Sequence, residues 1–143
     1  DREWSIIRTA GVMGFGDHNK RIFSLIVEKY KDLAQLTITK KVKRIYIHMD
    51  DLVEGITKVL ESKVKNEVFN IASGVTTLQN FAKVAKRHLP DLRWTLRDMP
   101  EGELVIGPAS CEKAKRLLGF KPRYNLENAI STYVKSVQLF RKL

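Results

Sequence analysis

The chain has 143 residues, of which 43% are hydrophobic and 29% are charged, a balance that fits one globular domain with its own core. No apolar run approaches the roughly 20 residues of a membrane-spanning helix, and the single cysteine, Cys111, excludes a disulfide framework and a cysteine-based zinc site. We therefore expect a protein of the reducing cytoplasm. The 26 basic and 16 acidic residues give a net charge of +10, which would suit nucleic acid, anionic lipid or phosphorylated small molecules.

The first expected strand, Trp4 to Ala10, is too apolar for an exposed edge and suits a buried parallel strand. A glycine-rich turn, Gly11 to Asp17, follows it. This turn lacks the Gly-x-Gly-x-x-Gly fingerprint of dinucleotide sites, and Asp17-His18 stands where a P-loop has Lys-Ser/Thr. We expect Asp17 or Asn19 to cap a helix that carries apolar residues from Ile22 to Tyr30.

In the middle of the chain, two short strands at 35–39 and 43–48 are expected to pair as a hairpin. The second strand alternates polar and apolar side chains from Arg44 to His48 and leads directly into a helix, for which Asp50 is the expected N-cap. Apolar residues at i, i+4, i+7 and i+8 form the stripe of this helix, namely Leu52, Ile56, Val59 and Leu60. A fixed cation, Arg44, thus stands shortly before a capped strand–helix junction.

The next segment repeats the change from strand to helix. Glu67 to Ala72 is expected to be another buried strand. Thr76 and Thr77 are expected to cap a helix that ends before Pro90, and 92–97 is expected to be a strand.

The last segment is expected to be helical. Ser110 would cap a short helix that ends at Gly119, and Asn125 would open the final helix. Strands and helices in this mixed order indicate the α/β class, with a few strands and about five helices. The apolar strands indicate a doubly wound sheet whose remainder would precede residue 1.

Four stretches resemble, in the same order, one known family. They are Arg8 to Asp17, Arg-x-Tyr-Ile-His-x-Asp-Asp-Leu at 44–52, Val-Phe-Asn-Ile-x-x-Gly at 68–74 and Lys-Ala-x-x-Leu-Leu-Gly-Phe-x-Pro at 113–122. They are similar to the C-terminal half of the extended short-chain dehydrogenases, the NAD-dependent nucleotide-sugar epimerases and dehydratases such as UDP-glucose 4-epimerase. The resemblance implies that residues 1–143 form a single C-terminal, substrate-binding domain of an extended Rossmann-type enzyme, whose NAD-binding domain is absent from this chain.

The same resemblance implies a substrate-binding site. Arg44 matches the diphosphate-binding arginine of the family, and Gly11 and Val12 lie in the segment that faces the substrate. Two positions depart from the family pattern, since Gly11 replaces a substrate-contacting Asn and Pro100 stands where a second phosphate-binding Arg is expected. Arg97 is the nearest basic residue that could substitute.

Other residues of the motifs are expected to be structural: Arg8, Gly14, His48, Asp50, Asp51 and Asn70. His48 and the two carboxylates would pin the strand–helix junction, and Asn70 would satisfy backbone groups near the end of its strand. Imidazole and carboxylates also suit a divalent metal, but the helix start explains Asp50 and Asp51 better. We therefore expect no metal site.

The catalytic residues are expected outside this chain. The resemblance implies NAD and a Tyr-x-x-x-Lys pair in the intact enzyme, whereas no tyrosine here has a lysine four residues later. We expect this chain alone to be inactive, to bind no cofactor and to self-associate through surfaces that the N-terminal domain would cover. The expected partners are that domain and a nucleotide-diphosphate sugar, without a membrane.

Two alternatives stay open at this point. The departures at Gly11 and Pro100 would fit an NAD(P)-linked binding or regulatory relative that has lost sugar chemistry. The net charge would fit a small basic nucleic-acid-binding domain, although the basic residues are not interleaved with aromatic ones as in an RNA-stacking surface.

Overall fold

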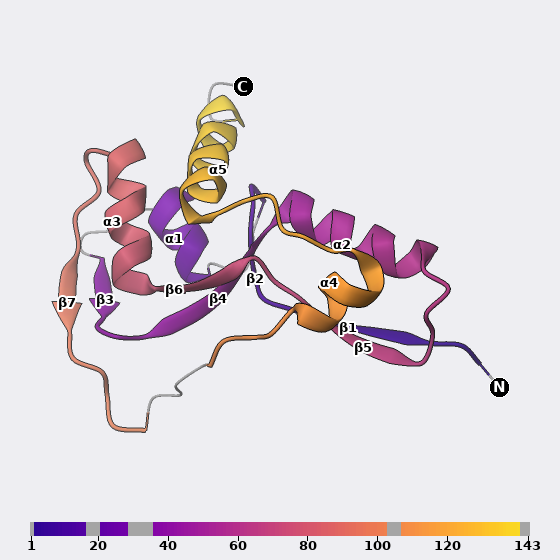
Figure 1. Ribbon diagram of the computed structural model, residues 1–143. Helices are drawn as coiled ribbons and strands as arrows, with labels where there is room; N and C mark the ends of the chain where they lie inside the picture. The colour runs from indigo at the N-terminus through magenta and orange to yellow at the C-terminus, as the bar shows by residue number, and fades with distance from the viewer. Residues whose placement is uncertain (1, 17–20, 29–35, 103–106, 141–143) are drawn as a thin grey trace.

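The computed structural model describes residues 2–16, 21–28, 36–102 and 107–140, and Figure 1 shows them as two adjoining lobes. The N-terminal end of the chain lies at the tip of one lobe and the C-terminal end lies on the other. Among these residues, no helix combines the length and the apolar character that crossing a membrane requires.

The smaller lobe is built on two parallel strands, β1 (Ser5–Thr9) and β5 (Glu67–Ile71). Helices α2 (Met49–Glu61) and α4 (Glu112–Leu118) pack against this pair. Their shared core consists of Ile47, Val59, Phe69, Ile71, Ala114 and Phe120. A Cβ atom on Gly55 would lie 2.6 Å from Cγ2 of Ile71, so glycine is what allows α2 to approach β5 this closely.

The larger lobe contains a three-stranded sheet with β4 (Lys43–His48) in its centre. Strand β2 (Gly11–Met13) pairs with β4 in parallel, and β6 (Gly74–Thr77) pairs with it antiparallel. A separate parallel pair joins β3 (Thr37–Thr39) to β7 (Thr95–Arg97).

Three helices complete the larger lobe: α1 (Ile22–Glu28), α3 (Leu78–His88) and α5 (Leu126–Phe140). They pack on one another and bury the larger of the two apolar cores, in which Phe23 of α1 stacks on Phe81 of α3 at a centroid distance of 4.5 Å. The Tyr133 hydroxyl of α5 donates a hydrogen bond to the Glu28 carboxylate of α1.

Two short connections between strands pass from the smaller lobe to the larger one. Only Ala10 separates β1 from β2, and only Ala72 and Ser73 separate β5 from β6. Each segment therefore leaves the sheet of the smaller lobe and enters the sheet of the larger one. This arrangement brings the ends of β1 and β5 next to β4, where the two lobes meet.

Several helix ends follow the expected local chemistry. The Thr77 hydroxyl accepts a hydrogen bond from the Asn80 backbone N–H, and the Asn125 side-chain oxygen accepts one from the Asn128 N–H. Gly119 closes α4 with a φ of 63°, the left-handed conformation that favours glycine. The α/β class with five helices among the described residues is confirmed.

Two expectations about strands are wrong. The segments 35–39 and 43–48 do not form a hairpin, because β3 pairs with β7 and β4 pairs with β2 and β6; residue 35 itself lies outside the described residues. The first strand is parallel as expected but is not buried. Within the described part of the chain it has a single neighbour, β5, and Trp4 and Ile6 are 47% and 50% exposed.

Three details of the helices also differ. His48, not Asp50, is the N-cap of α2, and Cys111, not Ser110, is the N-cap of α4. The expected core stripe of α2 is only partly buried, since Leu60 is 75% exposed while Val59 is buried. The proposed cap of α1 at Asp17 or Asn19 and the helical Tyr30 lie outside the described residues.

Candidate functional site: a cavity with two arginines

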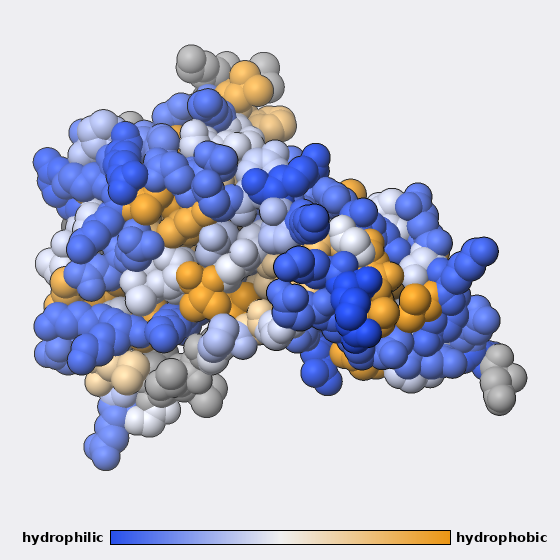
Figure 2. Space-filling model, in the orientation of Figure 1, coloured by the Kyte–Doolittle hydropathy of each residue, from blue (hydrophilic) through white to orange (hydrophobic). Residues whose placement is uncertain are grey.

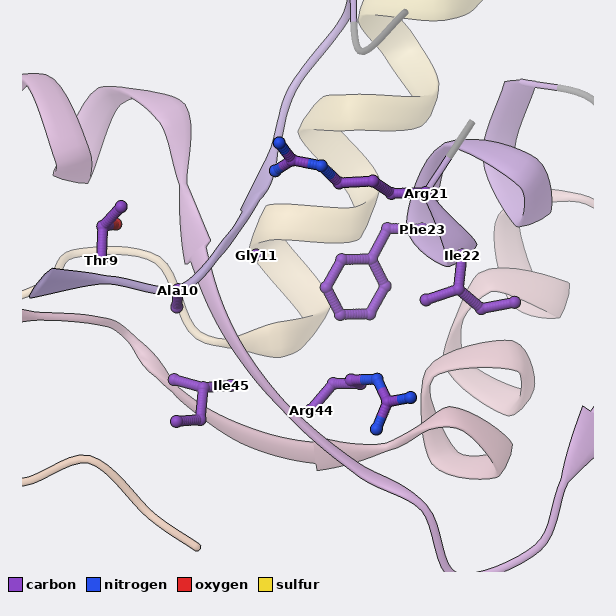
Figure 3. A pocket seen from close by; sticks show the side chains of 8 residues that line it. All are labelled: Thr9, Ala10, Gly11, Arg21, Ile22, Phe23, Arg44 and Ile45. Carbon is purple, nitrogen blue, oxygen red and sulfur yellow. The ribbon is translucent and has the colours of Figure 1, made fainter. Parts of the chain in front are cut away.

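A cavity of about 490 Å³ opens where β1 runs into β2, beside the start of α1 and the first half of β4 (Figure 3). Its wall consists of Thr9, Ala10, Gly11, Arg21, Ile22, Phe23, Arg44 and Ile45. Two of these described residues are cationic, and most of the remaining surface is apolar. The cavity lies in the size range of small-molecule sites, and its charge favours an anionic ligand.

The two arginines reach the cavity from different elements. Arg44 lies on β4, and its Nη1 donates a hydrogen bond to the carbonyl oxygen of Lys43 at 3.0 Å. Arg21 precedes α1 directly and supplies the carbonyl oxygen for the first hydrogen bond of that helix. In the view of Figure 3, the Phe23 side chain lies between the two guanidinium groups. A planar guanidinium suits paired hydrogen bonds to phosphate or carboxylate oxygens.

Gly11 permits a close approach between α1 and the sheet. A Cβ atom at this position would lie 3.1 Å from Cε2 of Phe23 and 3.3 Å from the carbonyl oxygen of Ile45. Both distances are shorter than ordinary van der Waals contacts of a Cβ atom. A side chain at residue 11 would therefore require the Phe23 ring to shift by a few tenths of an ångström.

A buried polar junction lies at the opposite end of β4. Asp51 is fully buried and accepts hydrogen bonds from the backbone N–H groups of Arg123 and Tyr124 at 2.9 and 3.1 Å, and from the Ser73 hydroxyl at 3.0 Å. One carboxylate thus connects α2, the segment after β5 and the loop that leads to α5. The junction therefore connects elements of the two lobes at the end of β4 that is away from the cavity.

His48 and Tyr124 form the second part of this junction. Nδ1 of His48 accepts a hydrogen bond from the Asp50 N–H at 3.2 Å, and the two aromatic rings stack at a centroid distance of 3.8 Å. Burial lowers the pKa of His48, against the smaller opposing effect of the nearby carboxylates. The Tyr124 hydroxyl donates to the Asp50 carboxylate at 2.9 Å, which raises the pKa of Tyr124.

This polar junction does not resemble a metal site. No group of three or more histidine, cysteine or acidic side chains within 2–16, 21–28, 36–102 and 107–140 is arranged to hold a metal ion. Nδ1 of His48 accepts the helix-capping hydrogen bond, and Asp51 accepts three others. Both residues therefore hold the strand–helix junction.

Of the residues expected to bind substrate, the structure brings Gly11 and Arg44 together at the cavity. Val12 packs instead against the core of the smaller lobe. Arg97 is on β7 and does not line the cavity; its Nε donates to the Thr39 hydroxyl at 2.9 Å.

The expected structural residues lie on the strands around the junction. Arg8 and Asn70 are opposite each other on β1 and β5. The side-chain amide of Asn70 donates to the carbonyl oxygen of Ser110 at 2.9 Å, a contact with backbone rather than with the cavity. Gly14 lies against Met49, whose side chain would be 3.0 Å from an added Cβ.

Sequence reasoning missed Arg21 and Phe23. Both precede or belong to a helix whose apolar residues were recognised, but a basic residue next to an amphipathic helix is usually a solvated surface residue. The signal that could have revealed Phe23 is Gly11, because a glycine beside a strand often marks a close approach by another part of the chain.

The fold is that of a Rossmann-type α/β protein, and a cavity lined by two arginines lies where its two lobes meet. Residues 2–72 match the model of the NAD dependent epimerase/dehydratase family. The UDP-glucose 4-epimerase of Thermotoga maritima, solved with UDP-glucose, superposes with a TM-score of 0.80 and 25% identity over 98% of this chain and 46% of that chain. Residues 2–72 thus carry the pattern of the NAD dependent epimerase/dehydratase family, and the chain has the fold of the epimerases and dehydratases on which it superposes.

Two further comparisons agree with this placement. The dTDP-glucose 4,6-dehydratase DesIV of Streptomyces venezuelae, solved with NAD and TYD, has the same fold, with a TM-score of 0.81 and 22% identity over 96% of this chain and 44% of that chain. An uncharacterized protein of Methanocaldococcus jannaschii is 24% identical over 93 residues, which are 64% of this chain and 28% of that protein. The chain thus spans less than half the length of the relatives it matches.

Proposed function

We propose that this chain is the C-terminal, substrate-binding portion of an NAD-dependent nucleotide-sugar epimerase or dehydratase. The cavity between Arg21 and Arg44 would bind the diphosphate of the nucleotide sugar. The observation that carries this proposal is the position of Arg44, which matches the family motif and lines a cavity together with a second arginine. The net charge of +10 would further attract an anionic substrate.

The chemistry of the wall fits this ligand in two parts. The guanidinium groups of Arg21 and Arg44 would each pair with phosphate oxygens, which distribute two negative charges over several acceptors. The apolar surface contributed by the half-buried Ile22 and Ile45 would contact the flatter, less polar parts of the nucleotide. Strand β4 and the start of α1 are anchored in the core of the larger lobe, so the cavity is formed before the ligand arrives.

We place the catalytic chemistry in a part of the polypeptide outside these 143 residues. The sequence contains no Tyr-x-x-x-Lys pair, and its glycine turn lacks the dinucleotide fingerprint. NAD would bind to an N-terminal Rossmann domain and supply hydride transfer there, while the residues of this chain hold the substrate. This portion alone would be inactive.

A single cysteine offers no disulfide pair, and we propose a cytoplasmic location for the intact protein.

The proposal also gives the exposed apolar surface of the smaller lobe a role. Figure 2 shows apolar atoms between the charged groups of this lobe and again at the C-terminal end of α5. Ile6 on β1 and Val53 and Leu60 on α2 are all at least half exposed. The N-terminal domain would cover this surface and pair with β1, and without that domain we expect copies of this chain to associate through it.

Binding of a nucleoside diphosphate by the isolated chain tests the proposal. UDP and dTDP would be titrated into the chain by calorimetry at low salt, with uridine as the uncharged control. We expect Arg44→Met to weaken the binding by roughly 10- to 100-fold, because charge-assisted hydrogen bonds contribute about 1.5–3 kcal/mol. Arg97→Met is the matched control, because Arg97 lies outside the cavity, and it should leave the affinity unchanged.

Two results would contradict the proposal. The first is that neither UDP nor dTDP binds to the chain. The second is that Arg44→Met binds them as tightly as the unaltered chain does. Tight binding of NAD(P) in place of UDP would support the alternative of a regulatory relative without sugar chemistry. The replacement of the family's asparagine by Gly11 is the observation that favours this alternative.

A further inference from the structure

A second cavity, of about 510 Å³, lies in front of the passage from β5 to β6, between α4 and the loop that leads to α5. It is lined by Ala72, Ser73, Gly74, Ala109, Cys111, Glu112, Lys115, Phe120, Lys121 and Pro122. The two cavities have no lining residue in common. The four family motifs assign no substrate contact to this one.

The wall of the second cavity has an apolar part and a cationic part. Ala109 and the exposed Pro122 form the apolar part of the wall, while Phe120, only 1% exposed, lies beneath it in the core of the smaller lobe. Lys115 on α4 and Lys121 on the following loop are exposed and contribute two ammonium groups. Glu112 lies 3.8 Å from Lys115 and offsets one of these charges, so the described lining residues carry a net positive charge.

The backbone around this cavity is held by buried contacts. Ser73 donates a hydrogen bond to the buried Asp51, and the same carboxylate binds the N–H groups of Arg123 and Tyr124, which follow the cavity residues of the loop. Gly119 turns the chain sharply between Lys115 and Lys121 through its left-handed conformation. The cavity is therefore preformed, and a ligand would not have to order it.

We propose that this second cavity binds a small amphiphilic anion, an apolar or aromatic body that carries one phosphate or carboxylate group. The apolar body would lie against Ala109 and Pro122, and the anionic group would pair with the ammonium groups of Lys115 and Lys121. A cavity of this volume accommodates a small organic molecule, whereas a bare inorganic ion would leave the apolar surface wet. This inference does not depend on what binds in the cavity between Arg21 and Arg44, here called the arginine cavity.

The single cysteine of the chain provides a direct reporter for occupancy. Cys111 lines the second cavity, and its Sγ lies 3.6 Å from the carbonyl oxygen of Ala72. Burial raises the pKa of the Cys111 thiol, so alkylation by iodoacetamide is best followed near pH 8.5. A ligand in the cavity would shield the thiol and slow this reaction.

The experiment measures the alkylation rate of Cys111 against the concentration of phenyl phosphate, in an Arg44→Met background that weakens binding in the arginine cavity. We expect a saturable decrease of the rate, at least about fivefold at saturation, and no such decrease with the uncharged analogue benzyl alcohol. Lys115→Met combined with Lys121→Met should abolish the protection. The matched control, Lys63→Met combined with Lys65→Met, removes two exposed lysines outside the cavity and should retain it.

Three results would overturn the proposal. The first is an alkylation rate that does not respond to phenyl phosphate. The second is equal protection by benzyl alcohol, and the third is protection that persists in the Lys115→Met, Lys121→Met variant. Circular dichroism of each variant checks that the fold is intact. Failure of UDP to bind at the arginine cavity would leave these outcomes unaffected, so the two proposals fail separately.

Discussion

Replacement of Asp51 by alanine tests whether the polar junction holds the two lobes together. Asp51 is fully buried and accepts three hydrogen bonds, so its removal leaves two backbone N–H groups and the Ser73 hydroxyl without their acceptor. The Arg123 guanidinium, 3.8 Å from the carboxylate, also loses part of its compensating charge. Removing one partner of a buried charged network costs about 3–5 kcal/mol, which corresponds to a decrease in Tm of roughly 10–15 °C for a chain of this length.

The assay is urea unfolding followed by circular dichroism, with thermal unfolding as a second measurement. Asp51→Asn keeps one acceptor oxygen and should lose less stability than Asp51→Ala. Asp98→Ala is the control, because Asp98 is 90% exposed and pairs with Lys40 at the surface, where a loss of at most about 1 kcal/mol is expected. If Asp51→Ala were as stable as Asp98→Ala, the junction would not connect the lobes in the way described.

Three other predictions follow from single positions. Gly55→Ala should lower the free energy of unfolding by about 1–3 kcal/mol through steric overlap with β5, whereas Thr57→Ala on the exposed side of α2 should change it by less than about 0.5 kcal/mol in urea. Burial lowers the pKa of His48, so the folded state disfavours its protonation. The associated stability is therefore present above about pH 6.5 and is lost as the pH falls below that value. His48→Asn should flatten this part of the curve of unfolding free energy against pH, measured with urea. Leu60→Lys should reduce self-association in sedimentation velocity more than Leu139→Lys at the far end of α5, and equal effects would contradict the proposed interface.

The fold class and most helix ends could be predicted because they depend on local patterns. Thr77, Gly119 and Asn125 act through hydrogen bonds or backbone angles within their own turn. The pairing of β3 could not be predicted in this way. The lysines between β3 and β4 fit a hairpin turn, but the Thr95 N–H donates instead to the carbonyl oxygen of Leu36, and this partner lies far along the sequence.

Burial was also misjudged for a physical reason. The apolar composition of β1 is typical of a strand with neighbours on both sides, whereas β1 pairs only with β5 among the described residues. Helix α2 shows the same difference between the burial expected from its composition and the burial observed, because Val59 faces the core whereas Leu60 is exposed. Local composition thus indicates how much surface a segment is suited to bury, but only the packed structure shows how much it buries here.

Two of the four residues singled out in the cavity between Arg21 and Arg44 could be predicted from the sequence. Arg44 belongs to a recognisable motif on β4, and Gly11 belongs to the segment expected to face the substrate. Arg21 and Phe23 come from the start of α1 and reach the cavity only because this helix packs in the larger core. No periodicity or spacing relates Arg21 to Arg44, so their shared cavity required the tertiary structure.

Gly11 is best understood together with Phe23. The ring of Phe23 is 4% exposed, stacks on Phe81 and comes within 3.1 Å of the position where a side chain of residue 11 would begin. The family's asparagine could not be restored here without moving a packed aromatic ring, a change of the overpacking type that destabilises by about 1–3 kcal/mol. Compared with the family pattern, the cavity wall therefore lacks a polar amide at residue 11. In our proposal, the two arginines provide the polar contacts to the ligand. A ligand of this cavity would be held mainly by its phosphate groups.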